Sequence, residues 1–153
     1  MRILVMASTE AINKARQLLN SEDDVEVIES ATNLEEGVQK ALILQPHIIL
    51  VQLYLPRYHA DDQFKLPSGM SIIEAVHRIE TPSIMHFLKP HIENTSNAIH
   101  KLSQQSESSK IVIMLPHSLL SDELELLKAA GVKYAITLPL ERDDVISLLR
   151  LLQ

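Results

Sequence analysis

The side chains that could carry acid–base chemistry in this sequence lie in one polar stretch and after one apolar run. The stretch "RYHADDQFKLPSG" holds His59, Asp61 and Asp62, and His117 follows the run "IVIMLP". A histidine paired with a carboxylate can transfer a proton during a reaction. The sequence places no nucleophile beside these four residues, so an enzyme built on them is a minor hypothesis.

Seven histidines raise the question of a metal site, because imidazole is a common metal ligand. Four of them lie in one interval of the chain, at His77, His86, His91 and His100. No two of these have the i, i+4 spacing that places both histidines of a zinc motif on one helix face. The chain has no Cys, which excludes thiolate ligands and disulfides. We therefore expect no metal and no other cofactor.

The elements that would position such residues alternate between two types. Five short apolar runs, rich in β-branched residues, predict strands at 3–6, 25–29, 48–53, 111–115 and 134–138. Helical patterns lie between them, with caps predicted at Thr9, at Thr32 with Glu35, at Ser118 or Ser121, at Gly131 and near Glu141. This alternation predicts a doubly wound α/β fold with a five-stranded parallel sheet.

Almost sixty residues separate the third strand from the fourth. The interval begins with a polar loop at 57–68, continues with a helical pattern at 69–80, and holds a further helix around 91–106. We expect a single domain over 1–153 with insertions at about 57–68 and 81–109. Sequence alone does not decide whether these insertions cover the crevice of the sheet or form a second docking surface.

In an open α/β sheet, the ligand crevice lies beyond the carboxyl ends of the strands. Those ends carry Ala7-Ser8-Thr9, Gln52, Leu115-Pro116-His117 and Leu138-Pro139. None supplies the hard carboxylate oxygens that Mg²⁺ prefers. The chain has only three Gly and contains neither a P-loop nor a G-x-G-x-x-G motif. The crevice is therefore predicted to be chemically silent, with Gln52 a neutral amide that caps backbone groups.

The order and spacing of these motifs resemble the receiver domain of two-component response regulators. "PHIILVQLYLP" is similar to that family's third strand, "GMSIIEAVHRI" to the start of its third helix, "IVIMLPHS" to its fourth strand, and "LLKAAGVKYAITLPL" to its Ala-Gly-Ala…Lys-Pro-Leu segment. The resemblance covers about 1–56, 69–80 and 110–153. It implies a flavodoxin-like sheet in the strand order 2-1-3-4-5, cytoplasmic signalling and no catalytic residues of a stand-alone enzyme.

Besides the insertions, the departures from that family fall at its phosphorylation and switch positions. The resemblance puts the metal-binding acidic pair on Ala7 and Ser8, the phosphate-accepting Asp on Gln52, and the hydroxyl residue on Leu115. The Lys of the family's Lys-Pro-Leu segment falls on Leu138, and the Pro after it is retained as Pro139. The family's aromatic switch position falls on Ala135. Each replacement removes a charge or polar group that phosphorylation requires, so a degenerate, phosphorylation-incompetent receiver is implied.

Charge and hydropathy limit the classes of partner that the chain can bind. The net charge of −6 argues against a nucleic-acid surface, because phosphate binding needs clustered Lys and Arg. The first ten residues hold only a short apolar run, too short for a signal peptide or a membrane span. A cytoplasmic protein without membrane contact is expected.

The last two helices carry more apolar residues than one-sided packing needs. Winding 141–152 at 100° per residue places Ile146 and Leu151 on opposite flanks of the apolar stripe, and Leu126 points away from the stripe of its own helix. We expect these three side chains to form an interface with a protein partner or a second copy. Two alternatives remain open: regulation by a small ligand or by modification of Ser8, Thr9 or Ser118, and a localisation module at the front of a pilus-assembly-type ATPase.

Overall fold

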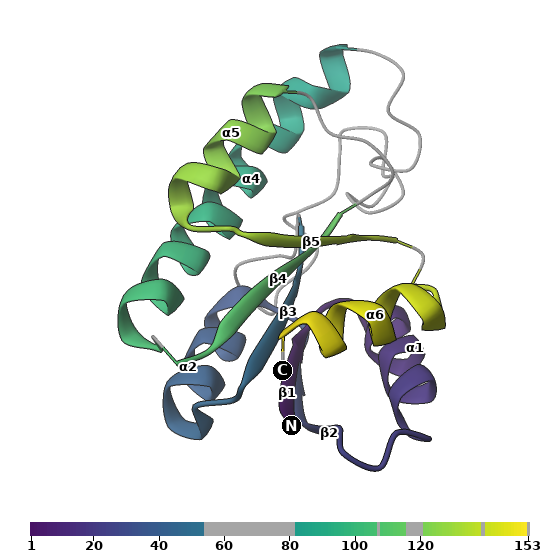
Figure 1. The fold of residues 1–153 in the computed structure, drawn as a ribbon. Coiled ribbons are helices and arrows are strands. Elements are labelled where there is room, and N and C mark those ends of the chain that lie inside the picture. Colours follow the sequence, from purple (N-terminus) through teal and green to yellow (C-terminus); the bar gives the residue numbers. More distant parts are fainter. Residues whose placement is uncertain (54–81, 107, 116–120, 139, 153) are drawn as a thin grey trace.

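A five-stranded parallel sheet forms the centre of the protein (Figure 1). The computed structural model describes residues 1–53, 82–106, 108–115, 121–138 and 140–152, and their side chains except those of 82–92, 121–124 and 126. The strands are β1 (Arg2–Met6), β2 (Glu26–Ala31), β3 (Ile48–Gln52), β4 (Lys110–Leu115) and β5 (Tyr134–Thr137). Their order is β2-β1-β3-β4-β5 and every pair is parallel. The predicted fold class and all five strands are confirmed.

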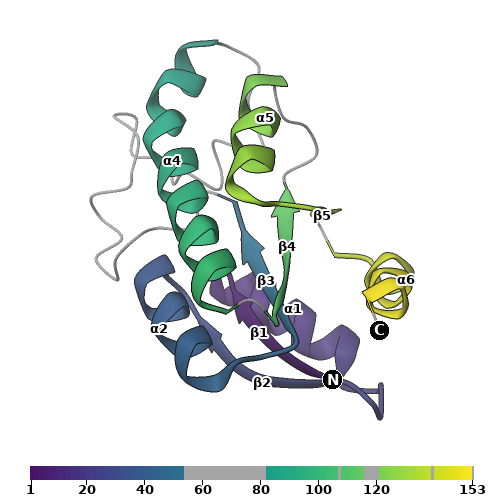
Figure 2. The same cartoon turned by 60° about the vertical axis from the view of Figure 1, so that its left-hand side comes forward.

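Helices cover both faces of the sheet, as Figures 1 and 2 show. One face carries α2 (Leu34–Leu44), α4 (Pro82–Gln105) and α5 (Ser121–Ala130), and the other carries α1 (Thr9–Leu19) and α6 (Arg142–Leu152). Because β-strand side chains alternate between faces, each of β1 to β4 supplies both cores, whereas β5 supplies only the core beneath α1 and α6. From β1, for example, Leu4 and Met6 pack beneath α2 and α4, whereas Ile3 and Val5 pack beneath α1 and α6.

The helix predicted at 91–106 is confirmed, but it is the second half of a longer helix. α4 starts at Pro82, a residue that suits the first helical position because it has no N–H to satisfy. It packs against α2 on one side and α5 on the other (Figure 2). Ile99 and Leu102 are fully buried against the sheet, so α4 is an integral layer of the main core. The predicted loop at 57–68 and helix at 69–80 lie outside the described residues.

The predicted N-cap of α1 is wrong by one residue. Ser8, not Thr9, has the extended backbone of an N-cap, and its Oγ accepts a hydrogen bond from the Ala11 N–H at 3.3 Å. Ser and Thr are both good N-caps, and they are adjacent here, so the sequence pattern could not separate them.

The predicted capping box of α2 is also displaced by one residue. Asn33 Oδ1 accepts from the Glu36 N–H at 2.8 Å, and Asn33 Nδ2 donates to the Glu36 carboxylate at 3.2 Å. This replaces the predicted pair of Thr32 and Glu35, because the helix begins at the buried Leu34. By contrast, the predicted left-handed cap at Gly131 is confirmed, with a φ of 111°.

A glycine in α2 allows that helix to approach β1 closely. A Cβ atom added to Gly37 would lie 2.7 Å from Met6 Sδ and 2.5 Å from Met6 Cγ. Gly37 and Met6 are both buried, so a larger residue at position 37 has no room without moving the core.

We expect Gly37→Ala to destabilise the protein, although alanine is normally the better helix former by about 1 kcal/mol. Overpacking against Met6 should lower the free energy of unfolding by about 1–3 kcal/mol, measured by urea denaturation. Gln39→Ala, an exposed change on the same helix, should alter it by less than about 0.5 kcal/mol. Adding Met6→Ala should reduce the cost of Gly37→Ala, and equal costs in both backgrounds would contradict the proposed clash.

Candidate functional site

The crevice at the carboxyl end of the sheet begins where β1 runs into α1. Ala7 is fully buried, and its N–H donates to the Ala31 carbonyl at 2.9 Å, which extends the pairing of β1 with β2. Ser8 follows and caps α1 through its Oγ. Both residues thus serve the local backbone, and neither offers a charged group to the crevice.

Gln52, at the end of β3, is bonded directly to this turn. Its Oε1 accepts a hydrogen bond from the Ser8 backbone N–H at 2.9 Å, between residues 44 positions apart in the chain. The Gln52 side chain is 4 % exposed, so the bond is shielded from water. This is the backbone-capping amide that the sequence predicted. It ties the end of β3 to the first turn of α1.

The leucines that end the last two strands point into opposite cores. The Leu138 N–H donates to the Leu115 carbonyl at 2.7 Å, so the two backbones are joined. The Leu115 side chain packs against the core beneath α2, α4 and α5, and that of Leu138 packs against the core beneath α1 and α6. Ala135 is exposed, and Pro139 lies outside the described residues. The structure therefore brings Ser8 and Gln52 together but turns the two leucine side chains away from each other.

The described residues at these strand ends carry none of the groups that metal-assisted phosphoryl chemistry uses. None of Ala7, Ser8, Gln52, Leu115 and Leu138 carries a carboxylate, and a side-chain amide has no nucleophilic oxygen. Within the described part of the chain, no three His, Asp or Glu residues are grouped so that they could hold a metal ion.

The other chemistry-bearing residues of the sequence analysis lie mostly outside the described residues. This applies to His59, Asp61, Asp62, His77 and His117, and to the side chains of His86 and His91. His100 is described: it is exposed on α4 and within 3.1 Å of the Gln104 amide. In the described segments, no helix is long and apolar enough to span a membrane.

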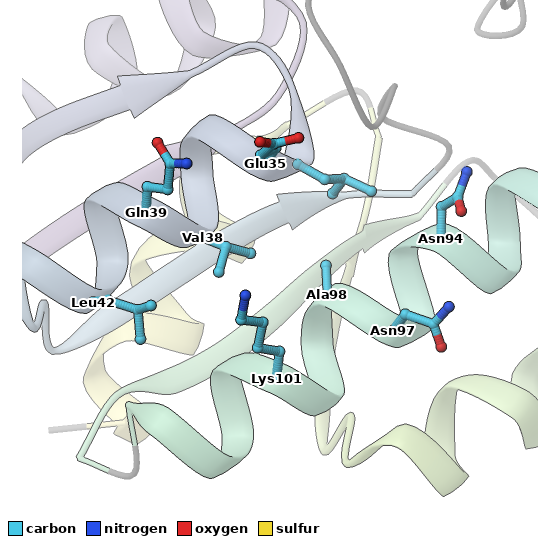
Figure 3. Close-up of a pocket in the computed structure, with 9 residues that line it drawn as sticks. Glu35, Val38, Gln39, Leu42, Asn94, Asn97, Ala98 and Lys101 are labelled. Atoms are coloured by element: carbon cyan, nitrogen blue, oxygen red, sulfur yellow. The ribbon is translucent and has the colours of Figure 1, made fainter.

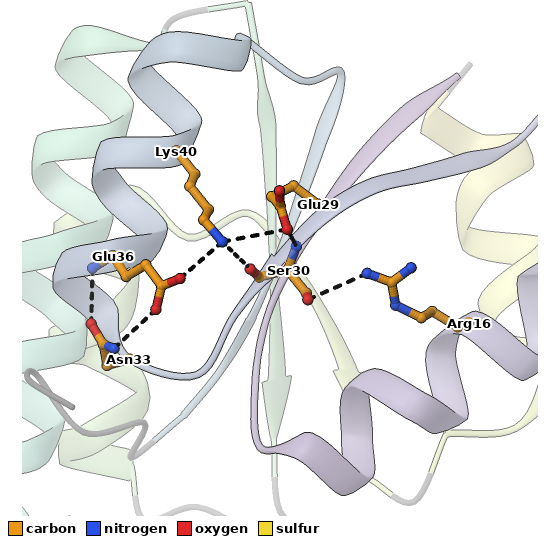
Figure 4. A network of polar contacts seen from close by, with 6 residues as sticks. All are labelled: Arg16, Glu29, Ser30, Asn33, Glu36 and Lys40. Carbon is orange, nitrogen blue, oxygen red and sulfur yellow. Dashed lines mark hydrogen bonds and ion pairs between the residues drawn. The ribbon is translucent and has the colours of Figure 1, made fainter. Parts of the chain in front are cut away.

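An electrostatic network lies where β2 meets α2 (Figure 4). Lys40 Nζ lies 2.8 Å from Glu36 Oε1 and 3.3 Å from Glu29 Oε1. The hydrogen bond to Glu36 raises the pKa of Lys40, with Glu29 adding to the effect and partial burial opposing it. The pKa of Glu29 is lowered, first by the Ser30 backbone N–H and then by Lys40.

This network also satisfies backbone groups of β2, which is an edge strand of the sheet. The Ser30 N–H donates to Glu29 Oε1 at 3.0 Å, and the Ser30 carbonyl accepts from Lys40 Nζ at 2.8 Å. Unpaired backbone groups on an edge strand invite pairing with another chain. Both groups of Ser30 are already satisfied, so this part of β2 is a poor site for adding a strand.

No family model matches the chain, and no curated protein matches it in sequence. Solved structures do match. The receiver domain of a modulated diguanylate cyclase from Desulfovibrio desulfuricans is 16% identical, covers 98% of this chain and 90% of its own, and has a TM-score of 0.63. The response regulator domain of CheB from Thermotoga maritima is 17% identical, with coverages of 99% and 92% and a TM-score of 0.60.

A third match is the pilus assembly protein cpaE from Burkholderia thailandensis, which is 16% identical, with coverages of 99% and 97% and a TM-score of 0.64. Together with the strand order β2-β1-β3-β4-β5, these matches define the fold of response-regulator receiver domains, as the sequence resemblance implied. The likeness extends over nearly the whole chain.

Gln52→Leu should release the turn before α1. The Ser8 N–H loses its acceptor in a site that water reaches poorly, so the free energy of unfolding should fall by about 1–3 kcal/mol. Hydrogen exchange of the Ser8 amide, followed by NMR, should accelerate selectively. Gln17→Leu, on the exposed face of α1, is the control and should change stability by less than about 0.5 kcal/mol. Unchanged protection of the Ser8 amide in Gln52→Leu would contradict the role of this bond.

Proposed function

We propose that the chain is a receiver-like signalling domain that is not phosphorylated and acts by docking to a protein partner or to a second copy of itself. The observation that carries the proposal is the hydrogen bond from the Ser8 N–H to Gln52 Oε1. Gln52 occupies the position where the resemblance places the phosphate-accepting Asp. There a neutral amide holds the β1–α1 turn, and the activity that remains is binding rather than catalysis.

The chemistry of the neighbouring positions supports this proposal. Mg²⁺ in proteins is held by carboxylates and water, and phosphoryl transfer to a side chain needs a nucleophilic oxygen. Ala7 and Ser8 supply no carboxylate, and two carboxylates there without a cation would repel each other. The replacements at positions 7, 8 and 52 are therefore consistent with one another. Where the acceptor is an amide, carboxylates that bind a metal ion no longer contribute to phosphorylation.

The apolar surface of α6 is the proposed docking face, in a narrower form than the sequence predicted. Leu151 is 72% exposed. Ile146, expected on an exposed flank, is half-buried and packs on the core beneath α1 and α6, as Leu148 does. The side chain of Leu126 lies outside the described residues. The interface proposal therefore rests on Leu151, with Ile146 and Leu148 at its border.

A second candidate function is that of a localisation module in a pilus-assembly-type protein. The likeness to cpaE, which covers 97% of that chain, favours it. The two candidates share a docking role and differ in the partner. A different form of regulation would be modification of Ser8, Thr9 or Ser118, or a small ligand in the crevice. The acetyl phosphate experiment below separates this form of regulation from the two docking functions.

Acetyl phosphate with Mg²⁺ should leave the intact mass of the native chain unchanged. The variant Ser8→Asp with Gln52→Asp restores two carboxylates at adjoining strand ends, and Asp preserves the helix cap at position 8. We expect this variant to gain Mg²⁺ affinity, measured by isothermal titration calorimetry, whereas the native chain shows none. Covalent labelling of native crevice residues, located by peptide mass spectrometry, would refute the proposal.

Leu151→Glu should dissociate a dimer formed through α6, because a charge at the centre of an apolar contact is desolvated without a partner. Light scattering should show the mass falling from dimer to monomer, with an unchanged circular dichroism spectrum. Ile43→Glu is the matched control: Ile43 is 81% exposed, but on α2, on the opposite face of the sheet. A native chain that is monomeric, or a dimer that survives Leu151→Glu, would contradict self-association through this face.

A further inference from the structure

A groove runs between α2 and α4, on the face of the sheet away from α1 and α6 (Figure 3). It has a volume of about 410 Å³. Aliphatic side chains form its floor: Leu34 and Val38 are buried, and Leu42 and Ala98 are half-buried. The floor is therefore a continuation of the core that the two helices leave partly uncovered.

Polar side chains with unused hydrogen-bonding groups line the walls. They are Glu35, Gln39, Asn94, Asn97 and Lys101. None of the five side chains forms a hydrogen bond or an ion pair with a described residue, and all except the half-buried Asn94 are exposed. The other flank of α2 differs sharply, because Glu36 and Lys40 there are both engaged. Only the groove flank of α2 is thus left with free polar groups.

The charges of the groove lie at its two ends. α2 and α4 both follow strands of a parallel sheet on the same face, so they run in the same direction. Glu35 lies with Asn94 near one end, and Lys101 lies beside Leu42 at the other, with its chain reaching across the floor in Figure 3. On α2, Glu35 lies three residues before Val38, and on α4, Lys101 lies three residues after Ala98, which faces Val38 across the groove (Figure 3). At 1.5 Å per residue, Glu35 and Lys101 are separated along the helix axes by about 9 Å.

This distance sets the length of an extended occupant. A span of about 9 Å corresponds to roughly three residues of extended peptide at about 3.3 Å each. A helix pairs its own backbone groups, whereas an extended peptide presents free N–H and C=O groups to the walls of a groove. Amide side chains on both walls can both donate to and accept from a peptide backbone. One lysine and one glutamate, on a chain of net charge −6, give no attraction for nucleic acid.

We propose that the groove between α2 and α4 binds a short extended peptide of a partner protein. The peptide has an aliphatic side chain on the floor formed by Val38 and Ala98. An Asp or Glu next to it pairs with Lys101, and a Lys or Arg on its other side pairs with Glu35. This inference extends the proposed docking function to a second surface that neither Leu151 nor the Ser8–Gln52 bond touches, so each can fail without the other.

Selection from a phage-displayed library of random heptapeptides on the immobilised full chain would test the proposal. The enriched peptides should share an aliphatic residue between one acidic and one basic residue. Fluorescence anisotropy with the enriched peptides should then show at least tenfold weaker binding to Ala98→Trp, which fills the groove. Circular dichroism and urea denaturation would verify that this variant is folded.

A charge exchange separates groove recognition from general attraction. Lys101→Glu should weaken binding of the enriched peptide at least tenfold, and replacing the peptide's acidic residue with Lys should restore it. Lys14→Glu is the matched control: it makes the same charge change on an exposed site of α1, across the sheet, and should leave binding within twofold. Either variant can be compared with native protein at two salt concentrations, because an exposed ion pair weakens with ionic strength.

Three results would overturn the proposal. They are the absence of any enriched peptide, enriched peptides that bind Ala98→Trp as tightly as native protein, and a dimer in light scattering that Ala98→Trp dissociates. The last result would assign the groove to a second copy of the chain. None of these outcomes bears on the phosphorylation experiment, which tests the crevice alone.

Discussion

The burial of β3 on both faces of the sheet is the constraint that shapes this protein. All five residues of the strand are buried, and Gln52 is its one polar side chain. An ionised carboxylate at such a site is costly unless a cation or several donors compensate it. Ala7 and Ser8 supply no such cation ligands, and among the described residues a single donor, the Ser8 N–H, bonds to the Gln52 side chain. A neutral acceptor of this length fits that environment, and the turn before α1 is fixed as a result.

The sheet and its helices could be predicted from the sequence because their signals are local and repeated. Uninterrupted β-branched runs such as 48–51 indicate strands covered on both faces, and the Gly at 131 fixes the end of α5. Both helix starts were missed by one residue, because Ser8 and Thr9, and Thr32 and Asn33, are adjacent residues that all serve as N-caps, with Ser and Asn only somewhat better than Thr. What chose between them was tertiary: in α2, the start at Leu34 places that side chain in the core.

The site was only partly predictable, because tertiary packing also decides where its side chains point. The identity of each residue at a strand end is visible in the sequence, but its direction is not. Leu115 is the last residue of β4 and is paired with Thr137, whereas Leu138 lies one residue beyond that pair. Because side chains alternate along a strand, this offset of one residue places the two leucines on opposite faces. The groove between α2 and α4 gave no sequence signal at all. Its lining residues come from segments about sixty positions apart, and their free polar groups are apparent only when the partners of every neighbour are known.

A fixed crevice has a consequence for how docking would be controlled. A ligand shifts a conformational equilibrium only if it binds the two states with different affinity. The Ser8–Gln52 bond is made within the chain and needs no added group, so it stabilises one arrangement of the turn at all times. Under the proposed docking function, α6 and the groove between α2 and α4 would therefore need no phosphorylation to be available. Their occupancy would then depend on the concentration and identity of the partners, as it does for any preformed surface.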